Sequence, residues 1–270
     1  MTEPTEKPSK SSRRFHWRRL FQFRLRTILI LTTIIAVCLG RWSYKARQQR
    51  DAVAALRKVV AAVFYDSSLP WTGWMDAPPQ WPQWVLDSIG VDYFASVQGL
   101  NLSNTQVTDT GLEHLTILTA LQTLNLSNTQ VTNAGLQHLE TLTALQYLDL
   151  TNTQVTDSGL EHIKGLTALQ VLSLRNTPLT DAGLELLHNL RALQELKLSH
   201  TKVTDAGLEH LSIMTGLRQL FLGNTRVTDA GLKHLKGLTD LQLLDLTDTQ
   251  VTDAGVARLQ ETLPNCKIER

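Results

Sequence analysis

Apolar residues return along most of the chain with a spacing of 24 residues. In each unit an L-x-L pair such as Leu124 and Leu126 alternates with polar residues, which predicts a short strand with one buried face. Later in the unit, leucines recur every third residue, as at Leu112, Leu115 and Leu118, which predicts a short helix packed on that strand. Seven such units follow one another without insertion, so we expect a solenoid of stacked units.

The polar half of each unit carries the phrase T-x-V-T-D-x-G-L. We expect its first threonine to turn the chain out of the strand and to hydrogen-bond neighbouring backbone. The second threonine and the aspartate after it are predicted to cap the short helix, and Asn133 stands in for the aspartate in one unit. The phrase begins at Thr105, Thr129, Thr153, Thr177, Thr201, Thr225 and Thr249.

The chain before the repeats opens on a basic arm, residues 1–26, which we expect to be a disordered cytoplasmic tail. An uncharged run at residues 27–39 follows, with Trp42 and Tyr44 after it, and predicts a transmembrane helix over 27–44. Thirteen residues are short for a membrane span, so a cleaved signal peptide and a buried soluble helix are alternatives. Flanking arginines that can snorkel favour the retained anchor.

Charge around this run predicts its orientation. Eight Lys and Arg precede it and six follow within 20 residues, which favours a cytoplasmic N-terminus and an extracytoplasmic repeat domain. Apolar spacing predicts a juxtamembrane helix over 45–65. Residues 66–96, with four prolines and four tryptophans, are predicted to cap the first repeat; a contact patch for a partner or the membrane is the alternative. Residues 257–270 are predicted to form the C-terminal cap, with Ile268 in place of the next strand's leucine.

With its L-x-x-L-x-L and T-D-x-G-L halves, the chain resembles the leucine-rich-repeat family over the seven repeats, residues 97–256. It is similar to the subclass that usually carries cysteine or asparagine where this chain has threonine. The layout also resembles the membrane-anchored, single-span repeat proteins of bacteria and, more loosely, internalin-type proteins, whose repeats are usually shorter. The resemblance implies an α/β fold: a right-handed solenoid, or horseshoe.

The distribution of net charge along the chain limits the classes of partner that the repeats can bind. Residues 1–60 hold 14 Lys and Arg against 3 Asp and Glu, a net charge of +11, whereas residues 61–270 hold 12 against 22, a net charge of −10. An acidic solenoid repels phosphate backbones, so we expect no nucleic acid partner. Two cysteines are too few for a disulfide framework.

Two rows of polar side chains recur on the predicted helices. The histidine row invites a metal-ladder interpretation and the aspartate row a calcium site, but metal sites need three or four converging ligands. The repeat itself explains both rows, so we predict no metal, no cofactor and no catalytic residue. The rows are His114, His138, His162, His210 and His234, and Asp109, Asp157, Asp181, Asp205, Asp229 and Asp253.

The repeat does not explain the variation on the exposed side of the predicted sheet, the concave side of the solenoid, which we call the sheet face. The first two units carry glycine, serine, threonine and asparagine there, and later units diversify. After Phe94 the chain has two aromatic residues, and both fall on this face. Exposed aromatic and arginine side chains are typical binding anchors. The candidate ligand-binding residues are Tyr147, Asp149, Arg175, Glu195, Lys197, Gln219, Phe221 and Asp245.

The sequence therefore predicts a membrane-tethered, non-enzymatic protein–protein interaction module that binds a protein or peptide on the sheet face. One alternative is a structural or envelope-spacing protein without a discrete ligand. The other is a cell-surface glycan-binding protein.

Overall fold

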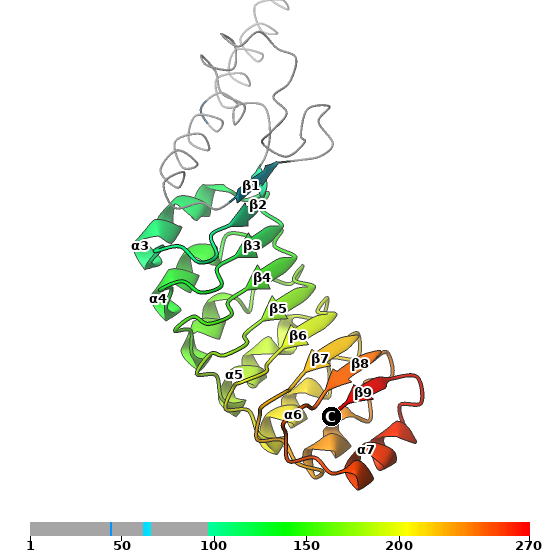
Figure 1. Ribbon diagram of the computed structural model, residues 1–270. Coiled ribbons are helices and arrows are strands. Elements are labelled where there is room, and N and C mark those ends of the chain that lie inside the picture. The colour runs from blue at the N-terminus through cyan, green and yellow to red at the C-terminus, as the bar shows by residue number, and fades with distance from the viewer. Residues whose placement is uncertain (1–43, 45–61, 66–96) are drawn as a thin grey trace, which may run out of the picture. The chain divides into compact units, whose positions relative to one another are not determined.

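The computed structural model describes residues 44, 62–65 and 97–270. All of these except Tyr44 belong to one compact unit, residues 49–270. In the described part of the chain, nine strands form a single sheet in chain order, antiparallel between the first two and parallel thereafter (Figure 1). The strands are β1 (Ala62–Tyr65), β2 (Val97–Asn101), β3 (Thr123–Asn125), β4 (Tyr147–Asp149), β5 (Val171–Ser173), β6 (Glu195–Lys197), β7 (Gln219–Phe221), β8 (Leu243–Asp245) and β9 (Lys267–Glu269).

Each repeat strand places one leucine in the core and its two neighbours on the sheet face. In β4, Leu148 is fully buried while Tyr147 and Asp149 are half-buried, as the alternation of side chains along a strand requires. The parallel strands pair in register, so equivalent residues of successive repeats form straight rows. One row is Tyr147, Val171, Glu195, Gln219 and Leu243, and the next is Asp149, Ser173, Lys197, Phe221 and Asp245.

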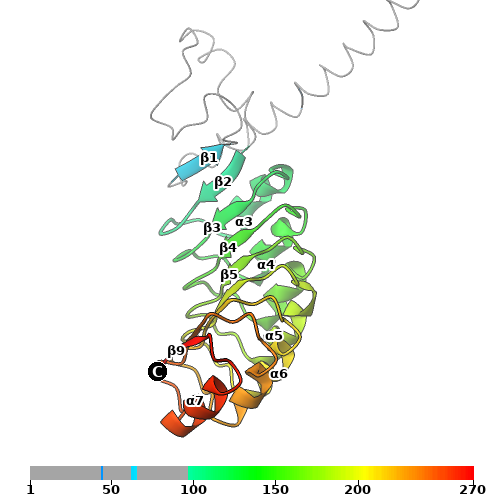
Figure 2. The ribbon, with the colours of Figure 1, turned by 90° about the vertical axis from the view of Figure 1, so that its right-hand side faces the viewer.

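Short helices line the other side of the sheet (Figure 2). Their leucines, for example Leu112, Leu115 and Leu118, are buried against the strand leucines in one continuous core, as predicted. Most helical segments last one or two turns, and several are 3-10 helices, the form used in short pieces. They are α3 (Asp109–Leu112), η2 (Glu113–Ile117), α4 (Asn133–Leu136), η3 (Gln137–Leu139), η4 (Asp157–His162), α5 (Asp181–Glu185), η5 (Leu186–Asn189), α6 (Asp205–Leu211), η6 (Gly231–Leu235) and α7 (Asp253–Gln260).

The turn that leaves each strand is built as the sequence predicted. The hydroxyl of Thr129 donates to the carbonyl of Leu126 at 2.7 Å, and the same bond recurs in all seven repeats. The residue before this threonine has a left-handed backbone, which asparagine and aspartate tolerate better than most residues. The left-handed residues are Asn104, Asn128, Asn152, Asn176, His200, Asn224 and Asp248.

The aspartate of T-D-x-G-L lies in the first turn of its helix in most repeats, as predicted, but its carboxylate has a further role that the sequence did not predict. Asp181 Oδ1 accepts the backbone N–H of Thr204, and its Oδ2 accepts the Thr204 hydroxyl, each at 2.7 Å. The carboxylate thus joins its repeat to the next, and we call this contact the aspartate–threonine clamp. Asn133 also accepts the N–H of the next repeat's threonine, Thr156, at 2.8 Å. The threonine itself caps the helix, as predicted, in several repeats: the N–H of Ala206 donates to the Thr204 hydroxyl at 3.3 Å.

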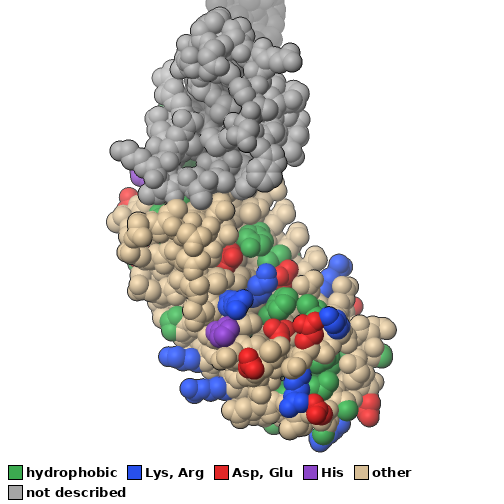
Figure 3. All heavy atoms as spheres, viewed as in Figure 1, with side chains coloured by type: hydrophobic (Ala, Val, Ile, Leu, Met, Phe, Trp, Pro, Cys, Tyr) green, Lys and Arg blue, Asp and Glu red, His purple; other side chains and the backbone are tan. Residues whose placement is uncertain are grey.

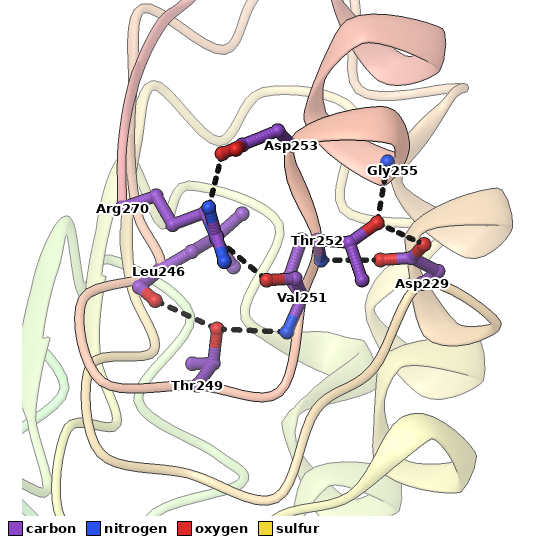
Figure 4. Close-up of polar contacts among 8 residues, drawn as sticks. All are labelled: Asp229, Leu246, Thr249, Val251, Thr252, Asp253, Gly255 and Arg270. Carbon is purple, nitrogen blue, oxygen red and sulfur yellow. Dashed lines mark hydrogen bonds and ion pairs between the residues drawn. The ribbon is translucent and has the colours of Figure 1, made fainter.

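The last clamp and the chain end are drawn in Figure 4. The two hydrogen bonds from Thr252 lower the pKa of Asp229. The next aspartate, Asp253, forms an ion pair with Arg270, whose Nε donates to the carbonyl of Val251 at 2.6 Å. In β9, Ile268 lies opposite Leu244, the place that the sequence assigned to it.

The first strand differs from the sequence prediction. Ala62–Tyr65 were placed in a helix over 45–65, but they form β1, antiparallel to β2 with Ala62 opposite Asn101. An uncovered strand edge offers unpaired backbone groups, and valine, phenylalanine and tyrosine favour strands, so pairing prevails over helical spacing.

The predicted membrane helix over 27–44 lies outside the described residues except for Tyr44. The predicted tail (1–26) and cap (66–96), and the rest of the juxtamembrane helix, also lie outside them. Within the described part of the chain, no helix is both long and apolar enough to cross a membrane.

Candidate binding surface on the sheet

The sheet face is uneven along the solenoid. Figure 3 shows charged and apolar side chains gathered over its C-terminal strands, whereas the part near the first repeats carries few of either. Seven of the eight sequence-predicted residues lie on β4, β6, β7 or β8, and Arg175 lies two residues after the end of β5. The register places them on a continuous surface.

Tyr147 and Asp149 form the end of this surface nearest the first repeats. The Tyr147 hydroxyl lies 3.5 Å from Asp149 Oδ2, while Asp149 Oδ1 accepts the N–H and hydroxyl of Thr151 at 2.9 and 2.6 Å. Burial raises the pKa of the Tyr147 phenol, and the negative charges of Asp149 and Glu195 raise it further. The phenol therefore stays protonated at neutral pH and presents a neutral ring with a hydrogen-bond donor.

Lys197 contacts two other strand residues, Glu195 and Phe221. Its Nζ lies 2.7 Å from Glu195 Oε1 on the same strand and 5.7 Å from the centroid of the Phe221 ring on β7. The ion pair and the cation–π contact hold the lysine in place over the aromatic ring. The ring of Phe221 is half-buried, so part of it is exposed on the sheet face.

A hollow of about 450 Å³ lies at the carboxyl ends of β5 to β8. Gly223 helps to create it, because a Cβ at this position would lie 3.1 Å from Asp245 Oδ2 and 3.3 Å from the carbonyl of Thr247. We call this space the hollow, and its lining consists of Arg175, Lys197, Ser199, His200, Phe221, Gly223, Asn224, Asp245, Thr247 and Asp248.

The hollow unites four of the eight predicted residues, namely Arg175, Lys197, Phe221 and Asp245. The other four lie outside its lining: Tyr147, Asp149, Glu195 and Gln219.

Sequence reasoning missed His200 and Asp248, which line the hollow from the left-handed position after the strand. A signal for them was present, since five other repeats carry asparagine there. In the first four repeats these asparagines hydrogen-bond to one another, from Asn176 Nδ2 through Asn152 down to Asn104 Oδ1. His200 follows directly after this asparagine ladder.

The histidine and aspartate rows lie away from the hollow, on the helical side. Among the described residues, no three His, Cys, Asp or Glu side chains are grouped so as to hold a metal ion. In the histidine row, His162 Nδ1 lies 2.6 Å from Glu140 Oε1. In the aspartate row, the clamp uses the carboxylates from Asp109 to Asp229.

Comparison with known proteins identifies the repeats. Residues 119–165 match a family model of two leucine-rich repeats, and residues 143–203 and 237–259 match two further leucine-rich-repeat models. None of the curated proteins compared with the chain matches it significantly. The leucine-rich-repeat resemblance that the sequence predicted is confirmed.

Two solved structures that the comparison matches to this chain are internalins of Listeria monocytogenes strain 4b F2365. Internalin C2 is 26% identical with a TM-score of 0.51, over 72% of this chain and 84% of its own. A second internalin, inlF, is 23% identical with a TM-score of 0.47, over 63% of this chain and 52% of its own. The chain therefore spans about half of the second internalin.

Proposed function

We propose that this leucine-rich-repeat protein is a non-enzymatic interaction module that binds a protein or peptide on the sheet face between β4 and β8. The observation that carries the proposal is the hollow and its surroundings. There, side chains depart from the repeat and bring an arginine, two aromatic rings and both signs of charge onto one surface. Aromatic and arginine residues dominate the binding energy of protein interfaces. A repeat scaffold holds them in register without any rearrangement of the backbone.

Site-specific cross-linking tests this function. A photo-reactive benzoylphenylalanine replaces Gln219, which lies on β7 at the centre of the surface but outside the lining of the hollow. Illumination of cells that produce the full-length chain is expected to yield an adduct of one defined mass that contains a second protein. The matched control carries the same group at Lys233, an exposed residue of η6 on the helical side, and is expected to give no such adduct.

Other outcomes identify the alternatives. A polydisperse adduct that a glycosidase removes would indicate a glycan ligand. No adduct from Gln219, or identical adducts from both positions, would contradict a discrete protein ligand on this face and favour a spacing role.

We further propose that residues 27–44 tether the chain to a membrane with the N-terminus in the cytoplasm and the repeats outside. A C-terminal alkaline phosphatase fusion is expected to be active, and a β-galactosidase fusion inactive. Replacing Arg13, Arg14, Arg18 and Arg19 with asparagine leaves four basic residues before the apolar run against six after it, so this variant should shift activity toward β-galactosidase. An active β-galactosidase fusion of the unaltered chain would contradict the orientation.

A further inference from the structure

Two charged side chains in the hollow, Arg175 and Asp248, have no ion pair or side-chain hydrogen bond with any described residue, and both are exposed. Lys197 is engaged in an ion pair with Glu195, whereas Asp245 has only a backbone hydrogen bond, from the N–H of Thr247 at 2.9 Å. Among the described residues, the hollow thus has an arginine without an ion pair at one end and two aspartates without one, Asp245 and Asp248, at the other.

The two ends are set apart by the sheet itself. Arg175 follows β5 and Asp248 follows β8, three strand spacings away, which is about 14 Å. An extended peptide advances about 3.3 Å per residue, so four residues cover about 13 Å. Between the ends lie the half-buried ring of Phe221 and Gly223, which has no side chain, so the middle of the hollow offers an apolar surface to a ligand side chain.

We propose that the hollow binds an extended peptide segment of the partner in which an acidic and a basic residue stand four positions apart with an apolar residue between them. The acidic side chain lies over Arg175 and the basic one over Asp248. The inference rests on the proposed function and narrows it to the partner's chemistry. A polyanion would meet Asp245 and Asp248, and a neutral sugar would leave both end charges without a partner.

Four blocked, fluorescein-labelled peptides test the inference: Glu-Ser-Leu-Ser-Lys and the three versions with Glu at both ends, Lys at both ends or Gln at both ends. Their binding to the full-length chain in a mild detergent is followed by fluorescence anisotropy. The Glu/Lys peptide should bind about tenfold more tightly than each of the others, because each of the others replaces the attractive contact at one or both ends of the hollow with a neutral or repulsive one.

Three variants test whether the preference for the Glu/Lys peptide comes from the hollow. Arg175→Glu makes both ends negative and should transfer the preference to the peptide with two lysines. Asp248→Asn, which restores the residue found at this place in other repeats, should remove the preference for a basic end. Gly223→Thr, which introduces the residue that two other repeats carry at the equivalent position (Thr151 and Thr247), should fill the hollow and weaken the binding of all four peptides.

The matched control is Arg191→Glu, the same change of charge at an exposed arginine outside the hollow, and it should bind like the unaltered chain. Equal binding of the four peptides, no binding of any of them, or an Arg175→Glu variant with unchanged preference would overturn the inference. The cross-link at Gln219 is independent of these peptides. A protein adduct without peptide selectivity would leave the proposed function standing and remove only this inference.

Discussion

Replacing Gly207 with alanine should lower the free energy of unfolding by about 2–5 kcal/mol. A Cβ at this position would collide with Asp181 Oδ1 and would lie 2.9 Å from Cδ1 of the buried Leu184. The first contact displaces a carboxylate oxygen that accepts the Thr204 N–H, and the second overpacks the core. The loss therefore combines a broken clamp with steric strain.

Two other glycines provide controls in the same fold. No atom lies within 4 Å of a Cβ built on Gly165, and the nearest atom at Gly216 is the carbonyl of Arg191 at 3.8 Å. Alanine at either position should change the free energy of unfolding by less than about 1 kcal/mol. Urea unfolding of the three full-length variants, followed by circular dichroism, compares them. A loss at Gly165 or Gly216 equal to that at Gly207 would contradict the clamp.

The aspartate–threonine clamp is a feature that could not be predicted from the sequence. The leucine core and the threonine turn were predictable, because alternation along a strand and a hydroxyl three residues from its acceptor are local patterns. Asp181 was assigned to its own helix for the same reason. The Asp181 carboxylate accepts hydrogen bonds from Thr204, 23 positions further along the chain, and that contact exists only once the repeats are stacked.

The candidate surface was predictable in part. Variation against a fixed repeat pointed to this face, and the eight residues chosen for that reason lie on its strands or close after one. The hollow was not predicted, because it depends on the absence of a side chain at Gly223 and on residues outside the strand alternation. His200 and Asp248 hold a left-handed backbone position that the strand pattern does not describe. Their departure from asparagine was visible, but its meaning depends on the turn geometry.

Replacing Tyr147, Arg175 and Phe221 together with alanine should weaken binding of the partner by about a hundredfold or more, because tyrosine and arginine are enriched among the few interface residues whose truncation costs about 2 kcal/mol or more. The substitution removes both aromatic rings, the uncompensated positive charge and the surface on which Lys197 lies. The three side chains are half-buried or exposed, and the strand leucines beneath them stay in place. The fold should therefore be retained.

The matched control replaces Ile213, Arg191 and Lys233 with alanine: an apolar residue that is 62% exposed and two exposed cations, all outside the hollow. Both triple variants should keep the circular dichroism spectrum of the unaltered chain. A retained spectrum shows that any difference in binding comes from the sheet face.

The dissociation constant of the protein cross-linked through Gln219, measured by calorimetry for the unaltered chain and both triple variants, tests the binding site most directly. We predict a loss of about a hundredfold or more for the variant lacking Tyr147, Arg175 and Phe221, and an unchanged constant for the control. Equal constants for all three proteins would contradict binding on the sheet face.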